Sequence, residues 1–191
     1  MQLEELEAGS TALVVGPRRE RRSFCLRHLA TAGRTAVAVL PSDPAGTVGE
    51  YSRLGGKAPL TLLQGEEPAG EPAEEPPGVH VVDVTADSLP AVGEATLGTL
   101  EADGPGDPAD RLWLAGLSEL LERASVQQVY RLLYILSKHV REVDGVGLYA
   151  LDGSVEPKTA RILCQPLDYE VTLAPESAPE IRTLAGLPDD G

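Results

Sequence analysis

Short apolar runs alternate with amphipathic stretches along most of the chain. The runs lack the strict apolar and polar alternation of a half-exposed strand, which is typical of strands buried on both faces. We predict strands at 11–15, 35–40, 79–84, 111–115, 145–151 and 169–173. Helices are predicted between them, at 20–32, 88–101, 126–143 and 156–164. The segment 51–63 has too little periodicity to predict an element.

The clearest predicted helix is 126–143. Ser125 and Gln128 have the spacing of a capping box at its start, and Gly145 follows it as a stop signal. Apolar residues recur along it with the helical period of 3.6. Tyr130 and Tyr134 on this helix, and Trp113 on the predicted strand before it, are expected to be core or interface contacts.

Strands and helices in alternation predict an α/β fold with three layers, in which helices cover both faces of a mostly parallel sheet of about six strands. Functional sites in such folds lie at the carboxyl ends of the strands. Those ends are expected at 16–23, 41–43, 85–87 and 115–119, and at Asp152.

One domain is expected, spanning residues 1–175, because 191 residues form one sizeable core more readily than two. Within it, residues 65–78 contain only proline, glycine, alanine and glutamate and predict a mobile surface loop. Residues 176–191 are expected to be a weakly ordered tail.

The charge balance narrows the choice of partners. Thirty acidic residues against 16 basic ones give a net charge of −14, which repels phosphate backbones and argues against a nucleic-acid partner. Only three of the basic residues are lysines, at positions 57, 138 and 158. Few lysines, many carboxylates and 4% aromatic residues resemble the composition of proteins from salt-loving archaea.

The positions of the cysteines and histidines do not indicate a metal site or a disulfide framework. Cys25 and Cys164 lie far apart within apolar helical patterns, so we expect buried free thiols. His28, His80 and His139 are too scattered for a metal triad. No stretch approaches the length of a membrane span, and the acidic first residues do not resemble a signal peptide, so a cytoplasmic protein without membrane contact is expected.

The turn after the first predicted strand contains the strongest candidate site. A phosphate-binding loop has the spacing G-x-x-x-x-G-K-[ST], and the chain has GPRRERRS at residues 16–23. Gly16 and Ser23 match, whereas Arg21 replaces the second glycine and Arg22 replaces the lysine. A side chain at the second glycine position blocks the tight backbone wrapping on which such loops depend.

Four arginines nevertheless lie within five positions of an acidic chain, at the start of a predicted helix where the dipole favours anions. The candidate anion or nucleotide site is Gly16, Arg18, Arg19, Arg21, Arg22 and Ser23. The alternative is that these arginines pair with the protein's own carboxylates, such as Glu20 and Glu50.

Three segments carry a resemblance to a known superfamily: ALVVGP at 12–17, the run from Arg111 to Asp152, and LDYEVTL at 167–173. With this element order the chain resembles RecA-like, KaiC-related P-loop ATPases, and in particular the small degenerate domains of that kind found in haloarchaea. The resemblance covers roughly residues 10–175. It implies a RecA-like fold.

The resemblance also implies which catalytic groups are absent. In the superfamily the fourth strand ends in an aspartate that binds magnesium through water, where this chain has Ala115, Gly116 and Leu117. The catalytic glutamate follows the second strand, where the chain has only Pro41, Ser42 and Asp43. Asp43 is better explained as a turn residue before Pro44. No catalytic residue is therefore assigned.

We accordingly expect a regulatory or signalling domain that binds proteins, does not hydrolyse ATP, and needs no cofactor or metal. The alternative is a nucleotide-binding switch or weak ATPase in which ATP binds at the arginine-rich segment. A protein partner or a homo-oligomer, formed through a sheet edge or the long helix, is expected in either case.

The net charge of −14 also predicts how salt affects the fold. Self-repulsion acts over the Debye length, which is about 30 Å at 0.01 M salt and about 3 Å at 1 M. We therefore expect the free energy of unfolding by urea to rise as sodium chloride is added. A free energy of unfolding that is independent of salt would contradict this expectation.

Overall fold

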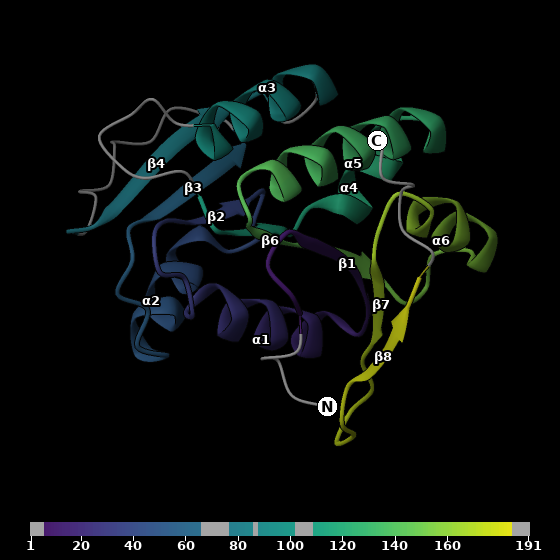
Figure 1. The fold of residues 1–191 in the computed structure, drawn as a ribbon, viewed down its shortest axis with the longest axis horizontal. Helices are drawn as coiled ribbons and strands as arrows, with labels where there is room; N and C mark the ends of the chain where they lie inside the picture. The colour runs from purple at the N-terminus through teal and green to yellow at the C-terminus, as the bar shows by residue number, and fades with distance from the viewer. Residues whose placement is uncertain (1–5, 66–76, 86–87, 102–108, 185–191) are drawn as a thin grey trace.

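A computed structural model describes residues 6–65, 77–85, 88–101 and 109–184. One mixed sheet of eight strands forms its centre, and helices cover both faces. Figure 1 shows α1 and α2 on one face and α3, α4, α5 and α6 on the other. No described helix is long and apolar enough to cross a membrane.

The strands are β1 (Ser10–Gly16), β2 (Ala36–Val39), β3 (Leu60–Gly65), β4 (Val79–Val84), β5 (Arg111–Leu114), β6 (Val146–Asp152), β7 (Tyr169–Thr172) and β8 (Glu180–Thr183). The helices are α1 (Arg18–Leu29), α2 (Pro44–Arg53), α3 (Leu89–Leu100), α4 (Leu117–Arg123), α5 (Val126–Glu142) and α6 (Pro157–Cys164).

The strand order in the sheet is β4-β3-β2-β5-β6-β1-β7-β8. All neighbouring pairs are parallel except β7 and β8. β1 lies between β6 and β7 and is in register with both, Val14 pairing with Ala150 and Val171. The predicted α/β class with a mostly parallel sheet is confirmed, although the sheet has eight strands where about six were expected.

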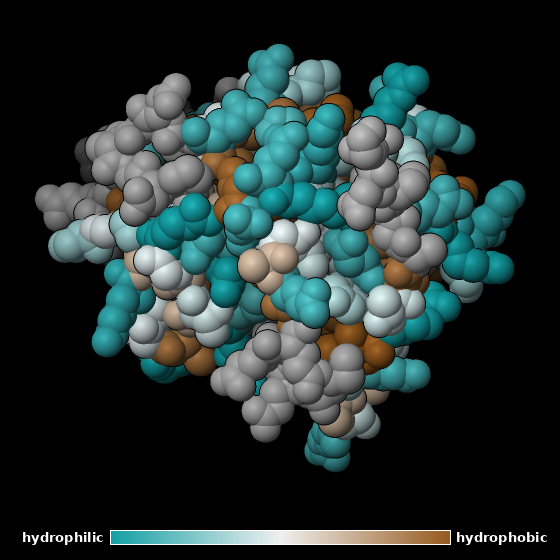
Figure 2. Space-filling model, viewed as in Figure 1, coloured by the Kyte–Doolittle hydropathy of each residue, from teal (hydrophilic) through white to brown (hydrophobic). Residues whose placement is uncertain are grey.

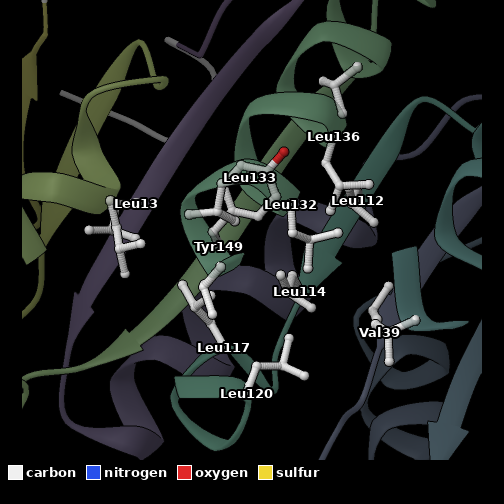
Figure 3. Close-up of a cluster of buried hydrophobic side chains, with 14 of the residues drawn as sticks. Leu13, Val39, Leu112, Leu114, Leu117, Leu120, Leu132, Leu133, Leu136 and Tyr149 are labelled. Atoms are coloured by element: carbon white, nitrogen blue, oxygen red, sulfur yellow. The ribbon is translucent and has the colours of Figure 1, made fainter. Parts of the chain in front are cut away.

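Each face of the sheet has its own apolar core. On the α5 side, Leu13, Leu114, Leu133 and Tyr149 are fully buried among other leucines (Figure 3). On the α1 side, Phe24 and its neighbours pack against the opposite face of the same strands. Both faces of the central strands are therefore buried from solvent, which explains why their sequences are apolar runs without alternation.

The predicted long helix is confirmed together with its cap. The Ser125 hydroxyl accepts a hydrogen bond from the Gln128 N–H at 3.3 Å, and the Gln128 side chain accepts one from the Ser125 N–H at 2.9 Å. Five apolar residues of α5 are buried against the sheet, and so is Ser137. Capping and periodicity thus agree at this helix, and such agreement makes a sequence prediction reliable.

Four elements were not predicted: α2, β3, α4 and β8. α2 begins with Pro44, and the carboxylate of Asp43 accepts a hydrogen bond from the Gly46 N–H at 2.9 Å. Asp43 is therefore a helix N-cap, a role close to the turn residue that the sequence predicts. α4 and α5 are separated by only two residues, so their apolar positions merge in the sequence.

The predicted tail is wrong for residues 180–183, which form β8 and pair antiparallel with β7. The boundary predicted at residue 175 accordingly falls in the connection between these two strands. The predicted loop at 65–78 lies largely outside the described residues, as do the final seven residues. Whether 1–175 is a domain of its own stays a prediction.

The first helix is displaced from its predicted position by about two residues. It begins at Arg18 and ends at Leu29, with Ala30 as C-cap, although the predicted helix extended to residue 32, just before Gly33. Gly33 donates its N–H to the Asp110 carboxylate, which also accepts hydrogen bonds from the Arg34 and Thr35 N–H groups. The earlier start of α1 bears directly on the candidate site.

His28 makes the fold sensitive to acid. Its ring is buried beneath α1, its Nε2 has no hydrogen-bond partner, and burial with the nearby Arg111 charge lowers its pKa to about 3. The unfolded chain takes up a proton near pH 6.5 while the folded one does not, so stability falls as the pH drops below 6.5.

We expect this residue to lower the free energy of unfolding by about 1 kcal/mol per pH unit between pH 6.5 and 5. Urea titrations of wild type and His28→Leu across this range measure the difference. The variant should show a shallower pH dependence than the wild type. Parallel curves for wild type and His28→Leu would disprove the assignment.

Candidate functional site

The connection between β1 and α1 consists of one residue. β1 ends at Gly16, Pro17 is the N-cap of α1, and Arg18 is the first helical residue. The Arg21 N–H already donates to the Pro17 carbonyl at 3.0 Å. The helix therefore starts two residues before its predicted start near residue 20. Residues 18–23 are helical backbone, whose N–H groups cannot wrap around a phosphate as those of an open loop do.

Gly16 has a structural role at this connection. Its φ is +152°, and a Cβ placed on it would lie 2.6 Å from the Leu173 carbonyl oxygen. Leu173 follows β7, whose chain approaches the end of β1 closely and donates the Leu173 N–H to Val15. The absence of a side chain at Gly16 allows this packing, so the glycine that matches the phosphate-loop pattern has another physical reason to be there.

The Arg21 side chain forms an ion pair across the site. Its Nη2 lies 2.8 Å from Oδ2 of Asp152, at the end of β6, and only 9% of the Arg21 side chain is exposed. The Asp152 carboxylate also accepts hydrogen bonds from the Ser154 hydroxyl and N–H. These two bonds, and then the Arg21 charge, lower the pKa of Asp152. The pair is therefore charged at neutral pH.

The other arginines of the segment also contact the protein itself. Arg22 Nη1 donates to Glu50 on α2 at 2.5 Å, and its Nη2 lies 3.9 Å from Asp43. Arg18 donates to the Ser42 hydroxyl at 2.6 Å. Pairing with the protein's own carboxylates, the alternative to an anion site, thus occurs at Arg21 and Arg22.

Arg19 and Ser23 take no part in the site. Arg19 is exposed and has no hydrogen bond or ion pair within the described residues. The Ser23 hydroxyl accepts a hydrogen bond from Arg27 one turn along α1. Of the six residues predicted as an anion site, only Arg18, Arg21 and Arg22 lie together on one cavity.

A cavity of about 490 Å³ lies beside these arginines at the carboxyl ends of the strands, where the fold class predicts a site. Three arginines, three carboxylates and several hydroxyls make its lining mixed in charge. Its polar lining residues are Arg18, Arg21, Arg22, Ser42, Thr47, Ser118, Glu119, Glu122, Asp152, Ser154 and Thr159. The sole tryptophan, Trp113, also lines it.

The carboxylates of α4 were not predicted as site residues. Glu119 and Glu122 line the cavity from one helix turn, and Ser118 accepts a hydrogen bond from the Asp152 N–H at 2.9 Å. Two acidic residues three positions apart after a strand end could have indicated that both carboxylates line the site. This spacing places them on one face only if the segment is a helix, and α4 was not predicted.

The arrangement offers little for metal or covalent chemistry. Ala115 and Gly116 follow β5, so no carboxylate stands directly at that strand end. Among the described residues, no group of three or more His, Cys, Asp or Glu side chains could hold a metal ion. Cys25 and Cys164 are buried free thiols whose pKa values are raised by burial, that of Cys164 to about 11.

Three buried donors beside the cavity make no hydrogen bond to any described residue. Arg21 Nε, Arg22 Nη2 and Trp113 Nε1 are buried without a hydrogen bond. Each belongs to a residue that lines the cavity. Buried donors of this kind cost free energy unless another group satisfies them, so this is the feature of the site that most favours a ligand.

Comparisons with known proteins agree with this architecture. The profile of a family described as a family of unknown function (DUF7504) matches residues 9–173. An ATPase from the type III secretion system of pathogenic bacteria has a similar structure, with a TM-score of 0.50 and 12% sequence identity. The match covers 91% of this chain and 54% of that one, so the chain spans about half of its length. No functionally curated protein matches the chain in sequence.

At 12% identity this similarity shows the fold alone. The fold is that of a P-loop ATPase domain of the RecA-like type, as the sequence resemblance implies.

The close approach at Gly16 predicts a large effect of one added methyl group. Gly16→Ala should destabilise the protein by about 2–4 kcal/mol, because the Leu173 backbone cannot move without disturbing β7. Gly49→Ala on α2, where a Cβ meets open space, is the matched control and should be neutral or slightly stabilising. Urea denaturation measures both, and equal midpoints would contradict the packing role of Gly16.

Proposed function

The chain belongs to the family of unknown function DUF7504, and we propose that it is a RecA-like domain that does not hydrolyse ATP and acts by binding another protein. We infer a regulatory role, in which the ATPase fold is kept as a scaffold. The observation that carries this proposal is the β1–α1 connection, where Pro17 alone separates the strand from the helix.

Phosphoryl transfer depends mainly on positioned charge. The loop N–H groups, the lysine and the metal ion normally supply it. Here the backbone is helical from Arg18, and Arg22 occupies the lysine position and binds Glu50. Arg21 is held by Asp152. To reach a phosphate, both arginines would have to leave carboxylates that are already in contact with them.

The charge balance of the cavity supports the same proposal. Glu119, Glu122 and Asp152 line it opposite the arginines, so a triphosphate would approach three carboxylates as well as three guanidinium groups. Without a cation to bridge them, the carboxylates repel the phosphates. An ATP-binding site would be expected to concentrate positive charge instead.

The second candidate function is a nucleotide-binding switch or weak ATPase. The unpartnered donors Arg21 Nε, Arg22 Nη2 and Trp113 Nε1 favour it, because a ligand with acceptor oxygens could satisfy donors beside the cavity. Such a ligand would have to displace Glu50 or Asp152 first. For that reason we rank this function second.

Phosphate release from ATP and magnesium tests the proposal, and we expect no rate above that of buffer alone. Arg22→Ala and Arg19→Ala make a matched pair, because both remove one charge from α1 but only Arg22 lines the cavity. Turnover that Arg22→Ala abolishes and Arg19→Ala preserves would overturn the proposal.

Trp113 provides a test of binding without hydrolysis. It is the sole tryptophan and lines the cavity, so its fluorescence should report a bound nucleotide. We expect no saturable change when ATP and magnesium are added. A saturable change at micromolar ATP, lost in Arg18→Ala and kept in Arg19→Ala, would favour the switch instead.

A further inference from the structure

The outer face of α5 combines apolar and cationic side chains at one place. Only three large hydrophobic side chains are classed as exposed among the described residues, and two of them, Tyr134 (37%) and Ile135 (43%), are neighbours on this helix. Arg131 and Lys138 are exposed on the same helix, one turn before and one turn after them. We call these four residues the α5 patch.

Helix geometry brings the four side chains of the α5 patch together. Arg131 is three residues before Tyr134 and four before Ile135, and Lys138 follows them by four and three residues. Positions three and four apart are neighbours on a helix surface, so each cation borders both apolar side chains. The two cations are separated by about 10 Å along the helix axis. The buried face of α5 points the opposite way, into the core.

The cations of the patch are, like Arg19, without a partner within the described residues, whereas most arginines of the protein contact one of its own acceptors. Neither Arg131 nor Lys138 has an ion pair or hydrogen bond within the described residues. By contrast, Arg21, Arg22 and Arg141 all bind carboxylates. The chain has 30 acidic and 16 basic residues, so positively charged side chains are scarcer than negatively charged ones. Figure 2 shows hydrophilic side chains over most of the visible face.

We propose that the α5 patch binds an acidic amphipathic segment of a partner protein. The carboxylates of that segment pair with Arg131 and Lys138, and one of its apolar side chains packs against Tyr134 and Ile135. Such helix-on-helix recognition uses apolar anchors at helical spacing, and charge complementarity selects the partner. The inference rests on the proposed function, since it names the partner of a protein-binding domain.

Charge also argues against a second copy of this chain as the occupant. If two α5 helices packed antiparallel about Tyr134 and Ile135, Arg131 of each copy would face Lys138 of the other. Packed parallel about a two-fold axis, each cation would face its own equivalent. Both arrangements bring like charges together, which costs free energy at an interface. A net charge of −14 on each copy adds to the repulsion.

The remainder of the surface makes the patch selective. An acidic segment is repelled by a protein of net charge −14, except where free cations lie next to an apolar anchor. Salt weakens the long-range repulsion more than the contact itself, because contacts are shorter than the Debye length. We therefore expect binding to persist at physiological ionic strength and above.

Two synthetic peptides of one helical design test the proposal on the full chain. Both carry leucines at positions three and four apart, and their flanking residues are glutamates in one peptide and lysines in the other. Fluorescence anisotropy of the labelled peptides measures affinity. The acidic peptide should bind the wild type. The double variant Arg131→Glu with Lys138→Glu should bind the acidic peptide roughly tenfold or more weakly. The same double variant should bind the basic peptide.

Arg53→Glu with Lys57→Glu is the matched control. It also takes the net charge from −14 to −18, and it lies beside Leu54, the third exposed large hydrophobic side chain. This control should keep the wild-type affinity for the acidic peptide. The double variant Tyr134→Ser with Ile135→Ser should lose affinity for the acidic peptide. All these side chains are exposed, and circular dichroism checks that each variant is folded.

Several outcomes would overturn the proposal. These are equal binding of both peptides, no binding of the acidic one, or the same loss in the control variant. A wild-type dimer that Tyr134→Ser with Ile135→Ser dissociates, seen by light scattering, would make a second copy the occupant. If the wild type binds phosphatidylserine vesicles and Arg131→Glu with Lys138→Glu abolishes that binding, the occupant of the patch is an anionic membrane.

These outcomes are separable from the test of the proposed function. If ATP is hydrolysed while the acidic peptide still binds the patch, the proposed function fails and the patch stands. If no ATP is hydrolysed and the peptide does not bind, the patch is wrong and the domain binds its partner elsewhere.

Discussion

The ion pair between Arg21 and Asp152 joins the first turn of α1 to the end of β6, across the place where a P-loop ATPase domain holds phosphate. Because nine-tenths of the Arg21 side chain is buried, removing Asp152 leaves a buried positive charge without compensation. α1 begins at Arg18, so Arg21 projects from its first turn toward Asp152. Just before this helix, Gly16 packs closely against the Leu173 backbone. The Arg21–Asp152 contact and the short β1–α1 connection thus occur together, and our proposal that no phosphate loop forms here rests on them.

The excess of carboxylates gives the arginines of α1 their partners. Asp152, Glu50 and the Ser42 hydroxyl each accept a hydrogen bond from one of three arginines that would otherwise favour an anion at a helix N-terminus. The site is thus close to electrically balanced before any ligand arrives. The α5 patch is the opposite case, because its cations have no such partners. Positive charge that is not paired within the described residues therefore lies on the outer surface of α5 rather than at the cavity.

Much of the fold was predictable because its signals are local. β4, the α5 capping box and the strand runs through both cores were correctly placed, since apolar periodicity and caps act within a few residues. β8 was not predictable, because its four residues are largely exposed and depend on pairing with β7. For the candidate site, the sequence indicated the edge of the sheet on which the cavity lies and three of the arginines that line it, but not the carboxylates of α4. The geometry of the site was not predictable, because the partners of Arg21 and Arg22 lie 131 and 28 residues away in the sequence.

A crystal structure of the protein grown with magnesium and a non-hydrolysable ATP analogue tests the central claim most directly. The account predicts that α1 still begins at Arg18, that Arg21 remains on Asp152, and that no phosphate lies against the end of β1. A triphosphate bound there with magnesium, residues 16–23 rewrapped around it and the Arg21–Asp152 pair broken, would contradict the account.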